Sequence, residues 1–229
     1  MEQLHNGFTL SLSEGSFPLS TDSMLLSGFA KLSRNAKVLD LGSGCGTLGI
    51  LLCANDPLCT VTGIELDPKA HEAALENIQR NGLGGRMDSI CADLTAIADS
   101  VAPGSFSCCI SNPPYFTAGP ASATVPLARR EDRCSMDDLF RAAAWAVKYG
   151  GDFFLVHRPE RLAQIFACAV RYSLEPKRLC CVHHKAGDPV NLVLVQCRKG
   201  AKPGLKWEQL CLHDPDGSPT DAYKSLYHL

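Results

Sequence analysis

The sequence lacks the features of a secreted or membrane-spanning protein. Its first residues, MEQLHNGFTLSLSEGSF, contain neither a positively charged stretch nor an apolar one, and no run of about 18 apolar residues occurs anywhere. Internal repeats, low-complexity tracts and long linkers are also missing. We therefore expect a cytoplasmic chain with no membrane partner, whose 229 residues pack round one hydrophobic core.

The 12 cysteines lack the C-x-x-C spacing of a zinc site. Two adjacent pairs, Cys108/Cys109 and Cys180/Cys181, lie in apolar runs, where neighbouring side chains of a strand point to opposite faces. Such pairs cannot converge on one ion. The sequence thus predicts reduced cysteines that are buried as small apolar side chains, and no bound metal.

The sequence has little net charge. The formal value of −2 excludes a uniformly basic nucleic-acid-binding protein. The charge is unevenly distributed, because residues 1–110 contain 6 Lys/Arg and 12 Asp/Glu, whereas residues 111–229 contain 16 and 12. Either this asymmetry arises by chance on solvated faces, or an anionic partner binds the second half of the chain.

Short apolar runs alternate with segments of helical length from residue 37 onward. This alternation predicts an α/β fold with a doubly wound, mostly parallel, seven-stranded sheet. A turn at Gly187-Asp188 joins the last two strands as an antiparallel C-terminal hairpin. We expect strands at 37–41, 60–65, 87–91, 106–111, 152–157, 176–183 and 190–198, and helices at 48–54, 67–81, 137–149 and 159–172.

A glycine-rich segment follows the first predicted strand. Gly42, Gly44 and Gly46 let the backbone approach a ligand closely, and an adenosine-containing ligand is the expected occupant. Gly44, Gly46 and Gly49 also fit the G-x-G-x-x-G pattern of nicotinamide-dinucleotide enzymes. Glu65, at the end of the next strand, would accept hydrogen bonds from ribose hydroxyls in either case, so this spacing leaves the cofactor open.

The segment Ser-Asn-Pro-Pro-Tyr at 111–115 follows the fourth strand and favours methyl transfer. An exocyclic amine is a poor nucleophile, because its lone pair is delocalised into the ring. The Asn112 side-chain oxygen and the Pro113 carbonyl can accept its two hydrogens and aim the lone pair at a sulfonium methyl group. Pro113 and Pro114 fix the backbone, and Tyr115 offers a ring on which a flipped base stacks. Asn112, Pro113, Pro114 and Tyr115 are therefore the predicted catalytic residues.

With these motifs the chain resembles class I methyltransferases, and specifically the bacterial family of adenine-N6 methyltransferases that act on valine tRNA next to the anticodon. The resemblance covers most of the chain. It rests on Asp-Leu-Gly-Ser-Gly-Cys-Gly at 40–46, Asn-Pro-Pro-Tyr at 112–115, Pro-Leu-Ser-Thr-Asp-Ser-Met-Leu-Leu at 18–26, Ala-Arg-Arg-Glu at 128–131 and Val-His-Arg-Pro-Glu-Arg at 156–161.

The resemblance implies a Rossmann-like fold with S-adenosyl-L-methionine as cofactor. By similarity, the three glycines would line its methionine part, Glu65 its ribose, and Ala92 with Asp93 its adenine ring. Thr21 and Asp22 would close over the cofactor, or serve only as the N-cap of a helix. Asp93 has the alternative of an ordinary surface aspartate. The predicted cofactor-binding residues are Thr21, Asp22, Asp40, Gly42, Gly44, Gly46, Glu65, Leu66, Ala92, Asp93 and Asn112.

Basic residues flank the expected mouth of this site. Together with Tyr115, the arginines Arg129, Arg130 and Arg158 are the predicted substrate-binding residues, since phosphate contact would suit guanidinium groups. Ion pairing with neighbouring carboxylates is the alternative for some of them. The partner implied is RNA, most specifically tRNA.

The sequence thus predicts transfer of a methyl group to the N6 amine of an adenine in RNA. Two alternatives remain. A protein glutamine amide also presents two hydrogens to an Asn-Pro-Pro-Tyr loop, and a non-catalytic RNA-binding module would bind S-adenosylmethionine without chemistry. We expect a closing segment at 1–36, the methyltransferase domain at 37–199 and an extension packed on it at 200–229.

Overall fold

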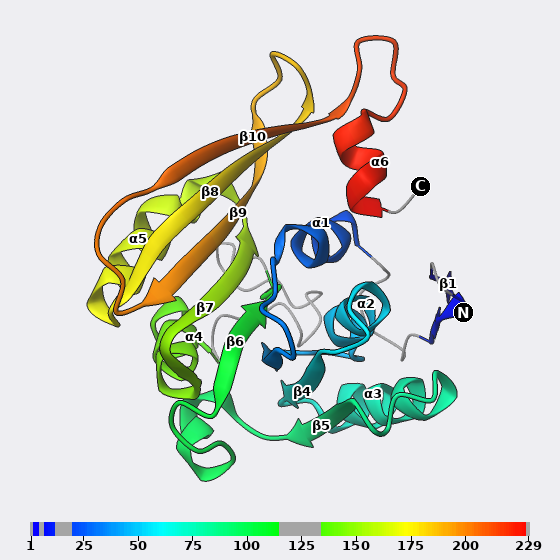
Figure 1. Ribbon diagram of the computed structural model, residues 1–229, viewed down its shortest axis with the longest axis vertical. Coiled ribbons are helices and arrows are strands. Elements are labelled where there is room, and N and C mark those ends of the chain that lie inside the picture. The colour runs from blue at the N-terminus through cyan, green and yellow to red at the C-terminus, as the bar shows by residue number, and fades with distance from the viewer. Residues whose placement is uncertain (1, 5–6, 12–19, 115–133, 228–229) are drawn as a thin grey trace, which may run out of the picture.

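The computed structural model describes residues 2–4, 7–11, 20–114 and 134–227. Eight strands of this part form one large mixed sheet with helices on both faces (Figure 1), and the first two strands of the chain pair with each other in a separate antiparallel sheet. The strands are β1 (Glu2–Gln3), β2 (Thr9–Leu10), β3 (Lys37–Leu41), β4 (Thr60–Glu65), β5 (Met87–Cys91), β6 (Phe106–Ser111), β7 (Val147–His157), β8 (Leu174–Lys185), β9 (Val190–Lys199) and β10 (Lys206–His213). The α-helices are α1 (Thr21–Phe29), α2 (Thr47–Asn55), α3 (Pro68–Arg80), α4 (Met136–Ala146), α5 (Leu162–Arg171) and α6 (Asp221–Tyr227), and 3₁₀ helices span Leu94–Asp99 and Pro159–Arg161.

The order of the strands reverses beside β3. The sheet runs β10-β8-β9-β7-β6-β3-β4-β5, and β9 is antiparallel to both of its neighbours. From β3 the chain proceeds to β4 and β5 on one side, then returns to form β6 and β7 in parallel on the other. Doubly wound sheets bind ligands where the strand order reverses in this way. The predicted Rossmann-like α/β fold with an antiparallel hairpin is confirmed.

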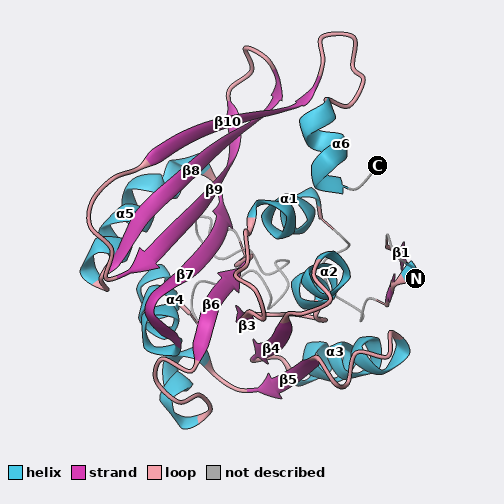
Figure 2. Cartoon of the chain, in the orientation of Figure 1, coloured by secondary structure: helices cyan, strands magenta, loops and turns pink. Residues whose placement is uncertain are grey.

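The sheet buries apolar side chains on both faces. Helices α1, α2, α3 and α6 lie on one side of it and α4 and α5 on the other, as Figure 2 shows. Adjacent cysteines are divided between the two cores: Cys108 and Cys180 belong to the first, Cys109 and Cys181 to the second. All four are buried free thiols, as predicted.

Two expectations about the strands and helices are wrong. The sheet has eight strands instead of seven, because β10 adds an edge strand parallel to β8. The helix expected at 137–149 ends at Ala146, since Val147 pairs with Phe106 and starts β7. The pair Gly150-Gly151 therefore lies within β7, after a break in register, instead of ending a helix.

Residues after Gly200 complete one edge and one face of this fold. β10 pairs along β8, and α6 contacts both α1 and β10. Tyr223 of α6 packs against the first core. In the described ranges, no helix is both long and apolar enough to cross a lipid bilayer.

Candidate active site

The carboxyl ends of four parallel strands bring most of the predicted site residues to one edge of the sheet. The glycine segment follows β3, Glu65 ends β4, Ala92-Asp93 follows β5 and Asn112 follows β6. Backbone hydrogen bonds hold these ends together: Gly42 N–H donates to the Ile64 carbonyl at 2.9 Å, and Ala92 N–H to the Glu65 carbonyl at 2.9 Å. Segments far apart in the sequence therefore form one site.

The glycine segment is an open turn tied to Glu65. Gly42, Gly44 and Gly46 have φ angles of +74°, +55° and +85°, a left-handed conformation that side-chain-bearing residues rarely adopt. A Cβ on Gly42 or Gly44 would meet no atom within 4 Å, so the space beside them is free for a ligand. Gly44 N–H donates to Glu65 Oε2 at 2.8 Å, and Asp67 N–H donates to Oε1 at 2.8 Å.

Asp40 carries a buried carboxylate beneath this turn. Its residue is 1% exposed, and neither carboxylate oxygen has a hydrogen-bond partner in the part of the chain that the structure describes. Burial, and then the charge of Glu65, raise the pKa of Asp40 to about 8, although the nearby backbone N–H of Gly49 lowers it in part. The hydroxyl of Ser43 is also buried, with no hydrogen-bond partner in the described ranges. Because unpaired buried polar groups are costly, these atoms suit a cationic, hydrogen-bonding ligand.

Asn112 is held from the opposite side of the site by α1. Its Nδ2 donates to Ser23 Oγ at 3.0 Å. Pro113 is buried and Pro114 half-buried, whereas Tyr115 lies outside the described residues. Thr21 and Asp22 form the first turn of α1 beside this contact, and the N-cap is Ser20, whose Oγ accepts the Ser23 N–H at 3.2 Å. The N-cap of α1 therefore lies one residue before the predicted cap at Thr21-Asp22.

The remaining predicted residues are divided between the site and its surroundings. Leu66 and Ala92 are half-buried at the same edge, and Asp93 caps the following 3₁₀ helix through Oδ1, which accepts the Thr95 N–H at 2.8 Å. Arg158 is exposed just beyond β7 and donates from Nη1 to the Asn191 carbonyl at 3.2 Å. Arg129 and Arg130 lie outside the described residues.

Two residues of this site were not predicted from the sequence. Ser23 contacts Asn112 across 89 positions of the chain, and no local pattern connects the two. Ser43 lies inside the glycine motif, but its burial depends on Gly63 of the neighbouring strand, where a Cβ would come within 2.5 Å of Ser43 Oγ.

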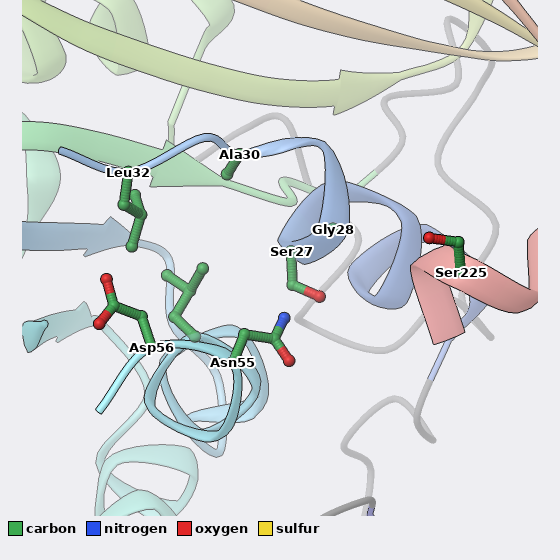
Figure 3. A pocket seen from close by; sticks show the side chains of 8 residues that line it. Ser27, Gly28, Ala30, Leu32, Asn55, Asp56 and Ser225 are labelled. Atoms are coloured by element: carbon green, nitrogen blue, oxygen red, sulfur yellow. The ribbon is translucent and has the colours of Figure 1, made fainter. Parts of the chain in front are cut away.

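A separate pocket of about 260 Å³ lies at the other end of α2. That helix starts after Gly46 and ends at Asn55, roughly 13 Å further along its axis. The pocket is therefore remote from the glycine segment, and α6 contributes one of its walls. Its lining residues, shown in Figure 3, are Ser27, Gly28, Ala30, Leu32, Leu52, Asn55, Asp56 and Ser225.

Comparison with known proteins assigns the family. Residues 19–166, which span β3 to β7 and the glycine and Asn-Pro-Pro segments, match the methyltransferase small domain. The chain belongs to this family. Together with the fold, this confirms the prediction of an S-adenosylmethionine-dependent methyltransferase.

Similar proteins and structures agree with this assignment. The chain is 29% identical to a tRNA1(Val) (adenine(37)-N6)-methyltransferase of Photobacterium profundum, over 86% of this chain and 84% of the relative. It is 28% identical to a Bacteroides fragilis protein of the same name, over 82% and 80%. A solved structure of a predicted O-methyltransferase from Agrobacterium tumefaciens superposes with a TM-score of 0.76 and 23% identity, covering 91% of this chain and 96% of that one.

Proposed function

We propose that this methyltransferase acts on the N6 amine of an adenine in tRNA, at the position next to the anticodon. The observation that carries the proposal is the placement of Asn112 at the same sheet edge as the glycine segment, with its side-chain amide held by Ser23. The two relatives named above support the choice of adenine 37 and of tRNA as the substrate.

The proposed cofactor site extends from β3 to β5. The buried carboxylate of Asp40 and the open backbone at Gly42 and Gly44 suit the charged methionine part of S-adenosylmethionine. Glu65 and Leu66 would hold the ribose, and Ala92 with Asp93 the adenine ring. Thr21 and Asp22 would close over the cofactor from α1. When bound, S-adenosylmethionine would supply a sulfonium methyl group for the amine nitrogen, and S-adenosylhomocysteine would be the second product.

The residues after β6 would make the amine reactive. Asn112 Oδ1 and the Pro113 carbonyl accept its two hydrogens, which draws the nitrogen toward tetrahedral geometry and directs its lone pair at the methyl group. Tyr115 would stack on the flipped base. The proton lost from nitrogen after transfer passes to solvent.

RNA would approach past the carboxyl end of β7. Arg158 is exposed there, and we propose that it contacts phosphate together with Arg129 and Arg130. Because phosphate contacts release bound counterions, the affinity for RNA should fall steeply with increasing salt.

The test uses labelled S-adenosylmethionine and total tRNA from a strain that lacks the homologous gene, with nucleosides identified by mass spectrometry. The wild-type chain is expected to form N6-methyladenosine in one tRNA. Asn112→Ala should lower the rate at least a hundredfold, because both amine alignment and one acceptor are lost. Gln79→Ala, which removes an exposed amide at the far end of α3, is the matched control and should retain activity.

Two outcomes would contradict the proposal. Label that enters a protein fraction but no RNA would favour a glutamine side chain as the methyl acceptor. A chain that binds S-adenosylmethionine and tRNA but transfers no label on long incubation would be a non-catalytic module.

A further inference from the structure

The amide of Asn112 has two ends that differ in chemistry. Oδ1 accepts hydrogen bonds, whereas Nδ2 only donates them. An exocyclic amine presents two hydrogens, so an amide rotated by half a turn would set donor against donor. The catalytic role of Asn112 therefore depends on which of the two orientations its amide adopts, and a neighbouring group can favour one of them.

Ser23 has the position and the chemistry for this selection. Its Oγ lies 3.0 Å from Asn112 Nδ2, and the residue is only 6% exposed. The Ser20 hydroxyl, whose oxygen already accepts the Ser23 N–H, donates to the same Oγ at 3.3 Å. Ser23 Oγ thus receives two donors and acts as the acceptor for Asn112. Among the described residues, no other side chain has a hydrogen bond to Asn112 in the structure.

We propose that Ser23 is a positioning residue that turns Asn112 Oδ1 toward the substrate amine. This inference rests on the proposed function, since it assumes that Asn112 accepts from an amine. Ser23 follows directly after Thr21 and Asp22 in the first turn of α1. The turn proposed to close over the cofactor therefore also sets the orientation of the Asn112 amide.

Steady-state kinetics of Ser23→Ala tests the effect on the reaction. We expect kcat to fall about fivefold to tenfold, the size of one neutral hydrogen bond, with the KM for tRNA and the affinity for S-adenosylmethionine unchanged. Ser27→Ala is the matched control, because Ser27 is a serine of the same helix, is 4% exposed and donates to the Met24 carbonyl. It should keep the wild-type kcat.

The side-chain amide resonance of Asn112, measured by NMR on ¹⁵N-labelled protein, tests the contact without any catalysis. The signal is assigned by its loss in Asn112→Asp. Ser23→Ala should shift it and speed its hydrogen exchange, whereas Ser27→Ala should leave it in place. A resonance that Ser23→Ala does not move would overturn the contact, and a moved resonance with an unchanged kcat would overturn its role in positioning. If wild-type protein methylates no RNA, the proposed function fails, and the resonance separates that failure from an absent contact.

Discussion

Replacing Glu208 with glutamine is expected to weaken the attachment of the edge strand β10. Arg178 of β8 donates from Nε to Glu208 Oε1 at 2.9 Å and from Nη2 to Oε2 at 3.1 Å. The same guanidinium donates from Nη1 to the Phe29 carbonyl at the end of α1 and to Gln196 Oε1 of β9, each at 3.3 Å. The Arg178 guanidinium thus links β8, β9 and β10 to α1, the helix that contacts Asn112.

The size of the effect follows from the pKa of Glu208. Its hydrogen bonds to Arg178, the largest cause, lower that pKa from 4.5 to about 2. A difference of about 2.5 between folded and usual pKa values corresponds to roughly 3 kcal/mol of folding free energy. The Glu208 side chain is 24% exposed, so solvent screening reduces the expected loss in Glu208→Gln to about 1–2 kcal/mol.

Urea unfolding of wild type and Glu208→Gln between pH 7 and pH 3 measures this loss. Because the folded pKa is depressed, the stabilisation is fully present above pH 4.5 and is lost as the pH falls toward 2, so the two stability curves should converge in acid. Glu76→Gln, at an exposed position of α3, is the control. A difference below about 0.5 kcal/mol at pH 7, or one that stays constant down to pH 3, would refute the reasoning.

Two further predictions concern the cofactor site. Because the pKa of Asp40 is about 8 without ligand, its carboxyl group carries a proton at pH 7, and binding of cationic S-adenosylmethionine should release that proton. Calorimetry in buffers of different ionisation enthalpy should detect the release in wild type but not in Asp40→Asn. In Gly63→Ala the new Cβ would lie 2.5 Å from Ser43 Oγ and 2.8 Å from its Cβ, which should displace the glycine segment. The affinity of Gly63→Ala for S-adenosylmethionine should fall at least tenfold. An unchanged affinity in a binding titration would show that the glycine segment shifts without any loss of cofactor binding.

Much of the fold could be predicted because it depends on local chemistry. The glycines at 42, 44 and 46 permit the left-handed turn after β3, and Asp67 caps α3 through its Oδ1, which accepts the Lys69 N–H. Short apolar runs between helical segments predicted seven strand positions, and the turn at Gly187-Asp188 predicted the antiparallel hairpin. Parallel strands then bring residues at their carboxyl ends together, so the grouping of Glu65, Asp93 and Asn112 required only the order of the strands.

The errors arose where pairing partners overrode the local pattern. Residues 147–149 continue a helical pattern, but Val147 gains a strand partner in Phe106. The segment 206–213 contains the polar residues Lys206, Glu208 and Gln209, and it becomes a strand through pairing with β8 and the bond of Glu208 to Arg178. Strand formation at an edge depends on the neighbour as much as on propensity.

The sequence by itself determined the type of fold and the glycine turn, and it predicted Asn112 as the residue that would face the amine. Only the tertiary structure decided how these groups are held. Packing removes Asp40 from water, where its carboxylate has no hydrogen-bond partner among the described residues, and it brings Ser23 to Asn112 across 89 positions. Burial and contact between distant side chains depend on the three-dimensional arrangement of α1 and the sheet, for which neither residue carries a local signature.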